Sequence, residues 1–252
     1  MAKHSKWHNI RHKKAIQDAK KSKIYTKVAK LIEIAARGGA DPKKNPALEM
    51  PLSKAKYFSV PKDVVEKALA KWSGNQNADQ LQEMVYEWVG AGGVGLIIKA
   101  ITPNRNRTAA NLKVLLNKWG GSIWEPGSVL WQFSEKGRVL VAGTKKISVV
   151  KGNQIEETQP LQEEIFEEFL LSLSVSDRRF EEWLCEVFSE KSDFFALKNG
   201  LEAAGYVIED AEIAFVPQST VELDDENSER LEKLLENLED DDDVDQVFHN
   251  TG

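Results

Sequence analysis

The residues best suited to chemistry in this sequence are cationic and lie near the start of the chain. Four lysines follow one another at spacings of three, four and three residues, which places their ammonium groups on one face of a helix. They are Lys20, Lys23, Lys27 and Lys30. The ammonium groups of such a row repel one another, and the phosphates of a nucleic acid would relieve that repulsion. The row therefore predicts contact with a nucleic-acid backbone, and an ordinary solvated helix face is the alternative.

The first fourteen residues add a basic tract to this row. They carry five Lys and Arg residues and no Asp or Glu, with Trp7 and three histidines among the cations. Aromatic and imidazole rings can stack on unpaired bases, as binding of single-stranded or looped RNA requires. The tract has too few apolar residues to order by itself, so we expect an arm that folds on its partner. His4, His8 and His12 stand at helical spacing without a Cys or carboxylate at ligand spacing, so no metal site is predicted.

Glycines gather at Gly90, Gly92, Gly93 and Gly95, a pattern that superficially resembles a phosphate cradle. A dinucleotide fingerprint must open a helix, because the helix N-terminus supplies the anion site, whereas this loop leads into a predicted strand. A hairpin turn is therefore the favoured interpretation. An exposed loop whose backbone approaches a ligand is a third interpretation.

A second loop precedes the helix that we expect to begin near Thr108. It contains Asn104, Arg105, Asn106 and Arg107. Arginines at a helix N-terminus oppose the helix dipole, so local stability does not explain them. Binding of RNA and attachment to carboxylates of another domain account for them equally well.

The sequence lacks the motifs of common enzymes. It has no nucleophile elbow, no HExxH and no paired Cys and His, so neither catalysis nor a cofactor is predicted. A lone cysteine, Cys185, favours a reducing compartment. The acidic run from Glu239 to Asp243 lacks the alternation and glycine of a calcium loop. We expect a solvated turn there, which could also repel nucleic acid or mask the basic arm.

Charge divides the chain into two parts. The 252 residues carry 34 Lys and Arg against 40 Asp and Glu, a formal net charge of −6. Residues 1–72 hold 18 of the basic and 6 of the acidic residues, so they carry +12 and the remainder carries −18. A basic front fits a nucleic-acid partner. No apolar run approaches the roughly 18 residues of a membrane span and no secretory signal is evident, so we expect a cytoplasmic protein without membrane contact.

Hydrophobic periodicity predicts three helices in the basic part. The first begins near Ala15 and ends at Gly38-Gly39, the second covers residues 47–58 and the third follows Pro61. Pro51 lies inside the second, where an interior proline removes a backbone donor, so we expect a kink or a late start.

Beyond the polar linker of residues 73–79, strand and helix patterns alternate. Strands are expected at residues 81–89, 94–101, 129–133, near 139, 147 and 180, and at 184–188, 211–216 and 244–248; helices are expected at 108–119, 161–173, 193–204 and 228–238. The predicted fold class is α+β with three domains. These are an all-helical domain of residues 1–74, a discontinuous ferredoxin-like α/β domain of residues 80–136 and 206–252, and an inserted one of residues 137–205.

Several motifs together resemble one known family. Lys3-His4-Ser5-Lys6-Trp7, residues 38–42 (GGADP), residues 104–108 (NRNRT) and Asp242-Asp243-Val244 closely match the signature of the YebC/PmpR family. The resemblance covers essentially the whole chain and implies a non-enzymatic protein with a helical domain and two α/β domains. The nucleic-acid contacts expected from residues and resemblance together are Lys3, His4, Ser5, Lys6, Trp7, Arg11, His12, Lys13, Lys14, Lys20, Lys23, Lys27 and Lys30.

Members of that family are described as DNA-binding transcriptional regulators and as ribosome-associated translation factors that relieve stalling at proline-rich stretches. A lysine row contacts phosphates without reading bases, and no helix-turn-helix pattern is evident, so ribosomal RNA is the preferred partner and DNA the alternative. The sequence assigns no oligomeric state. It departs from the family where Tyr86-Glu87-Trp88-Val89 replaces the usual Tyr-Glu-Gly-Tyr, and at Glu49-Met50-Pro51.

Overall fold

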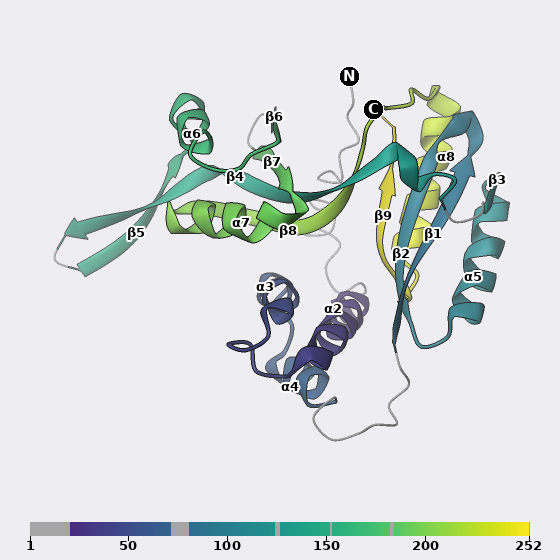
Figure 1. Cartoon of the computed structure of the whole chain (residues 1–252), viewed down its shortest axis with the longest axis horizontal. Coiled ribbons are helices and arrows are strands. Elements are labelled where there is room, and N and C mark those ends of the chain that lie inside the picture. Colours follow the sequence, from purple (N-terminus) through teal and green to yellow (C-terminus); the bar gives the residue numbers. More distant parts are fainter. Residues whose placement is uncertain (1–20, 72–80, 124–126, 152, 182–183, 252) are drawn as a thin grey trace. The chain divides into compact units, whose positions relative to one another are not determined.

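The computed structural model describes residues 21–71, 81–123, 127–151, 153–181 and 184–251, and shows a mixed α+β protein (Figure 1). It divides into two compact units. The first combines residues 1–133 with residues 217–252, and the second comprises residues 134–216. The boundary that sequence analysis expects between a helical domain and the first α/β domain lies inside the first unit.

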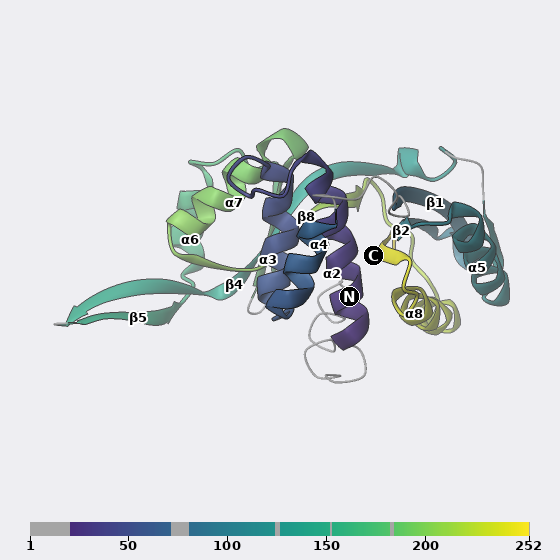
Figure 2. The ribbon, with the colours of Figure 1, turned by 90° about the horizontal axis from the view of Figure 1, so that it is seen from below.

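Three helices of the first unit share one small apolar core. They are α2 (Lys21–Ala35), α3 (Glu49–Tyr57) and α4 (Lys62–Ala70) (Figure 2). Val28, Ile32, Leu48 and Ala68 are buried at the centre of this core. Beyond α2 a 3-10 turn (Ala36–Gly38) leads to Gly39, whose φ of 119° and ψ of 145° suit glycine but differ from the left-handed helical cap expected from the glycine pair.

The late start expected for the second helix is confirmed. A 3-10 turn (Pro46–Leu48) comes first, and the Asn45 side chain accepts a hydrogen bond from the Ala47 N–H at 3.2 Å. Because α3 begins only at Glu49, Pro51 lies in its first turn. Backbone N–H groups there have no partner within the helix, so the proline costs no hydrogen bond.

The α/β part of the first unit is an antiparallel sheet covered by two helices. Its strands lie in the order β3 (Gly121–Ile123), β1 (Gln82–Gly90), β2 (Gly95–Thr102) and β9 (Val244–His249). Helices α5 (Arg105–Lys118) and α8 (Asp225–Glu239) pack on the same face of this sheet (Figure 2). Leucines of both helices and alternate residues of β1 and β2 form the core, because successive side chains of a strand point to opposite faces.

The prediction of a strand at residues 129–133 is wrong. Residues 130–132 form a 3-10 turn (Leu130–Gln132), and the strand that follows α5 is the short β3. The cause is Glu87, which projects from the sheet face opposite the helices. Its buried carboxylate accepts hydrogen bonds from the backbone N–H groups of Gly127, Val129 and Leu130 at 2.5, 2.6 and 2.7 Å, so these groups are not available for strand pairing. Burial raises the pKa of Glu87, but the three donors outweigh it and hold that pKa below its ordinary value.

The second unit is a five-stranded sheet with two helices. Its elements are β4 (Phe133–Lys151), β5 (Asn153–Pro160), α6 (Glu163–Leu170), β6 (Asp177–Glu181), β7 (Leu184–Glu190), α7 (Phe194–Ala203) and β8 (Tyr206–Pro217). The two strands expected near Val139 and Ile147 are one, because β4 pairs first with β7 and then with β5 along its length. The strand β5 was not predicted.

Arg138 lies at the centre of the second unit with its side chain 6% exposed. Its guanidinium contacts Glu186 of β7, and Glu212 and Asp210 of β8, at up to 3.8 Å. Burial alone would lower the pKa of Arg138, but the three carboxylates raise it above its ordinary value. The ion cluster thus joins three neighbouring strands and keeps the buried charge compensated.

Replacing Glu87 with Gln should lower the free energy of unfolding by about 2 kcal/mol at neutral pH, because an amide offers one acceptor oxygen where three N–H groups need a carboxylate. Denaturant unfolding of the full chain measures this change. Glu83 lies exposed on the same strand, and Glu83→Gln is the matched control, with an expected change below about 0.5 kcal/mol. Equal effects of the two substitutions would contradict the assigned role of Glu87.

Ser59 is a non-glycine residue with a φ of 53°, in the left-handed region just after α3. Ser59→Gly should therefore stabilise the protein, by about 0.5–1 kcal/mol, because glycine adopts this conformation without steric cost. The control is Ser53→Gly in the middle of α3, which should destabilise by a similar amount, about 0.5–1 kcal/mol. Thermal unfolding of both variants checks the pair, and a destabilised Ser59→Gly protein would refute the argument.

Candidate nucleic-acid interface

The described lysines of the predicted row point toward the end of helix α8. Lys23 donates to the carbonyl oxygen of Asp240 at 2.9 Å, and Lys27 to that of Glu239 at 2.6 Å. One turn further along α2, Lys30 donates to the carbonyl oxygens of Ile101 and Asp242 at 3.1 and 2.8 Å. The spacing read from the sequence does place these ammonium groups on one helix face, and that face contacts the acidic segment 239–243.

The end of α8 explains why lysines gather there. The last carbonyl groups of a helix have no partner within it and carry the negative end of the helix dipole. Helix α8 has no basic residue in its last turn, and an acidic run follows it. Cations from a distant part of the chain, α2, compensate this negative end.

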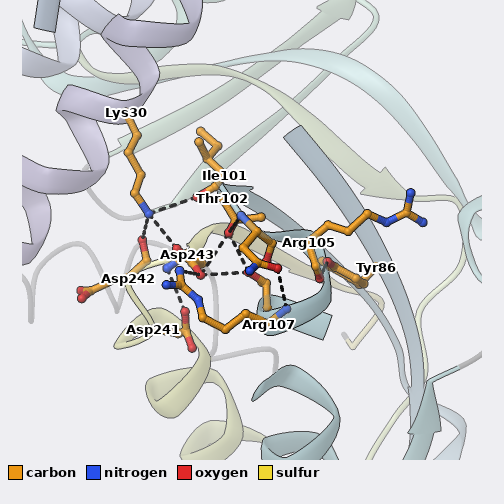
Figure 3. A network of polar contacts seen from close by, with 11 residues as sticks. Lys30, Tyr86, Ile101, Thr102, Arg105, Arg107, Asp241, Asp242 and Asp243 are labelled. Carbon is orange, nitrogen blue, oxygen red and sulfur yellow. Dashed lines mark hydrogen bonds and ion pairs between the residues drawn. The ribbon is translucent and has the colours of Figure 1, made fainter. Parts of the chain in front are cut away.

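Asp243 is the centre of the contact (Figure 3). Its side chain is 7% exposed, and one carboxylate oxygen accepts a hydrogen bond from the Lys30 ammonium at 2.9 Å. The other oxygen accepts hydrogen bonds from the Arg107 guanidinium at 2.7 Å and from the hydroxyls of Thr108 and Thr102 at 2.9 and 3.3 Å. One carboxylate therefore connects α2, the start of α5 and the end of β2.

The protonation of Asp243 follows from these partners. Burial raises the pKa of its carboxyl, but the hydrogen bonds from Lys30, Arg107 and Thr108 outweigh burial and lower that pKa to about 2. The carboxylate is thus charged throughout the physiological range. Sequence analysis did not predict this residue as a site, although the absence of a basic residue in the last turn of α8 was a readable signal.

The arginine loop lies at the start of α5. The helix begins at Arg105, three residues earlier than expected, because the Asn104 side chain accepts the Arg107 N–H at 3.1 Å and caps it. Of the two roles considered for these arginines, Arg107 does contact a carboxylate, but that of Asp243, which belongs to the same expected α/β domain and not to another one. Hydrogen bonding and charge from Asp243 raise the pKa of Arg107 above its ordinary value. Arg105 is exposed, and its carbonyl oxygen accepts the Tyr86 hydroxyl at 3.3 Å.

The glycine loop is a hairpin turn between β1 and β2, as favoured from the sequence. Gly92 and Gly93 adopt φ of 72° and 82°, and the Gly90 N–H donates to the Val94 carbonyl at 2.8 Å. The positive φ favours glycine at position 92; a Cβ there would also come within 2.6 Å of Leu223 Cδ2, the end of a side chain that would have to shift. Trp88, where the sequence departs from the family pattern, is part of the sheet core. Its side chain is 3% exposed and lies against Gly90.

The rest of the predicted contact surface lies outside the described residues. This applies to Lys20 and to the N-terminal candidates Lys3, His4, Ser5, Lys6, Trp7, Arg11, His12, Lys13 and Lys14. Within the described ranges no group of three or more His, Cys, Asp or Glu side chains could hold a metal ion. Nor does any described helix have the length and apolar character of a membrane span.

The depressed pKa of Asp243 predicts how stability depends on pH. A carboxyl whose folded pKa lies below its unfolded value of 3.8 stabilises the protein above that value, and the contribution disappears as pH falls toward about 2. At pH 6 the free energy of unfolding of the wild type should therefore be about 2 kcal/mol higher than that of Asp243→Asn. This difference should disappear as pH falls from about 4 to 2. Urea unfolding over this range measures it, and a constant gap would contradict the network.

Comparison with known proteins gives matches over nearly the whole chain. The family described as TACO1/YebC protein N-terminal domain matches residues 5–75, and TACO1/YebC second and third domain matches residues 81–251. A probable transcriptional regulatory protein YrbC of Bacillus subtilis is 39% identical over 251 residues, covering 99% of both chains. A probable transcriptional regulatory protein of Solidesulfovibrio magneticus is 42% identical over 251 residues, which is 99% of this chain and 96% of that one.

A solved structure agrees with these matches. The crystal structure of a conserved hypothetical protein from Aquifex aeolicus superposes with a TM-score of 0.85 at 32% identity, covering 98% of this chain and 97% of that one. The resemblance inferred from the motifs is therefore confirmed by sequence and by fold. The chain belongs to the TACO1/YebC family.

Proposed function

We propose that the protein is a non-enzymatic, nucleic-acid-binding regulator of gene expression that acts in the cytoplasm. The observation that carries this proposal is the separation of charge, with +12 on residues 1–72 and −18 on the remainder. A polyanion is attracted to the first part and repelled by the second, so contact is confined to the basic end. Its relatives' names, which describe regulators and no enzyme activity, support the same class.

The partner that we propose first is ribosomal RNA, with the protein acting as a translation factor that relieves stalling at proline-rich stretches. Trp7 and the histidines among the N-terminal cations suit looped RNA, whose unstacked bases are open to stacking. An acidic body is poorly suited to lying along duplex DNA. The family resemblance supplies the translational role itself.

DNA is the second candidate, and a specific observation favours it. Both relatives named above are called probable transcriptional regulatory proteins. Lysines that contact phosphates serve either nucleic acid, and they fix position without specifying sequence. A DNA-binding regulator would need base contacts as well, for which Arg105 is an exposed candidate.

We further infer three domains for this function. The helical domain, residues 1–74, would carry the nucleic-acid contact, and the α/β domains of residues 80–136 with 206–252 and of residues 137–205 would be ferredoxin-like. Family descriptions that name an N-terminal, a second and a third domain support this division. In that arrangement the turn at Gly90, Gly92 and Gly93 and the loop of residues 104–107 belong to the second domain.

Ribosome co-sedimentation beside a promoter-DNA binding assay tests the choice of partner. Under the first proposal the full chain sediments with ribosomes and is released by rising salt, since phosphate contacts depend on counterion release. Tight promoter binding that resists nonspecific competitor, without ribosome association, would establish the DNA alternative instead.

The N-terminal tract should supply much of the salt dependence. Changing its five cations to Gln should reduce affinity for a structured RNA and flatten the log-log salt slope by up to about 4, at roughly 0.7–0.9 ion per lost contact. The changed residues are Lys3, Lys6, Arg11, Lys13 and Lys14.

The matched control removes five exposed lysines from other positions of the helical region. They are Lys43, Lys44, Lys56, Lys62 and Lys67. Fluorescence anisotropy at several salt concentrations compares the two sets. If both sets flatten the slope equally, net charge and not the N-terminal tract determines binding.

A further inference from the structure

We propose that the acidic segment 239–243 and nucleic acid compete for the lysine face of α2, so that nucleic-acid binding detaches the helical region from the sheet. This inference rests on the proposed function and assigns a regulatory role to the same surface. The surface consists of Lys23, Lys27 and Lys30, whose ammonium groups all donate to residues of segment 239–243. The ligand chemistry is a phosphate backbone, whether of RNA or of DNA.

Lys30 makes the competition mutually exclusive. An ammonium group has three N–H donors, and those of Lys30 go to the Ile101 carbonyl, the Asp242 carbonyl and the Asp243 carboxylate. Its side chain is only 15% exposed. Lys30 cannot donate to a phosphate until at least one of these three contacts breaks.

The remaining two lysines favour exchange. Lys23 and Lys27 contact backbone carbonyl oxygens, which carry partial charge, whereas a phosphate presents a full negative charge to each ammonium. Phosphates can therefore replace the carbonyls at these two positions with a gain in electrostatic energy. At Lys30, nucleic acid must also displace an ion pair, the one with Asp243.

Asp243 can lose Lys30 without becoming an uncompensated buried charge. Arg107 remains at 2.7 Å on its other oxygen, supported by the hydroxyls of Thr108 and Thr102. A buried carboxylate left without any partner would make release very costly. The second cation lowers that cost and permits the lysine face to leave as a unit.

The helical region is built to separate. Its core draws on residues of α2, α3 and α4, while the sheet core draws on β1, β2, β9, α5 and α8, and among the described residues the two clusters share no member. The polar contacts of the lysine face connect them, together with a hydrogen bond from Arg37 to the Leu81 carbonyl. Polar contacts of this kind weaken in the presence of a competing polyanion.

A double-mutant cycle on nucleic-acid affinity tests the competition. Asp243→Asn should tighten binding of a single-stranded RNA oligonucleotide by about three- to tenfold, because Lys30 is released from its strongest internal partner. In a Lys30→Met background the same substitution should change affinity less than about twofold. Asp225→Asn, at the exposed start of α8, controls for net charge and should also change affinity less than about twofold. An equal gain with and without Lys30 would overturn the proposal.

Energy transfer between two dyes measures the detachment itself. Ser53→Cys on α3 and Glu236→Cys on α8 are exposed attachment points, while Cys185 is buried with its pKa raised to about 12 by burial and does not compete for label. Saturating RNA, and in a parallel arm duplex DNA, should lower the transfer efficiency. Binding with unchanged efficiency overturns this inference alone, whereas no binding to either nucleic acid overturns the proposed function and this inference with it.

Discussion

The first unit depends on one buried carboxylate. Asp243 follows the acidic end of α8, and donors from α2, β2 and α5 converge on it. A buried charge is tolerated only when it is paired and hydrogen-bonded, so the fold must bring donors to this aspartate, and Arg107 of α5 supplies a cation besides Lys30. The same carboxylate gives the lysines of α2 an internal partner. The contacts that stabilise the first unit therefore also determine whether these lysines are available to a ligand.

That link gives the separation of charge a second meaning. Under the proposed function the acidic body would repel nucleic acid from most of the protein, and its segment 239–243 also contacts part of the basic surface. The sequence suggested that this acidic run could mask the basic arm, which lies outside the described residues; in the structure the run contacts Lys23, Lys27 and Lys30 of α2 instead. A surface that must be uncovered binds only polyanions able to replace all its internal partners, which favours dense phosphate over scattered acidic groups.

Local patterns predicted most of the elements, and long-range contacts account for the errors. The helices and the β1–β2 hairpin were readable because apolar spacing and glycine turns act within a few residues. The false strand at residues 129–133 came from ignoring Glu87, which is forty residues away, and the divided β4 came from not knowing its two successive partners. Asp243 was missed for the same reason, since its donors Lys30 and Arg107 are far apart in sequence. The N-terminal tract lies outside the described residues, so its role stays a prediction.

The most direct test of the central claim is ultraviolet cross-linking of the full chain in cells, followed by mass spectrometry of peptide–nucleotide adducts. Aromatic side chains stacked on bases and cations packed against a backbone are the groups brought closest to nucleic acid. The account predicts ribonucleotide adducts on the peptide that contains Trp7. Adducts confined to residues 134–216, or their complete absence, would contradict it.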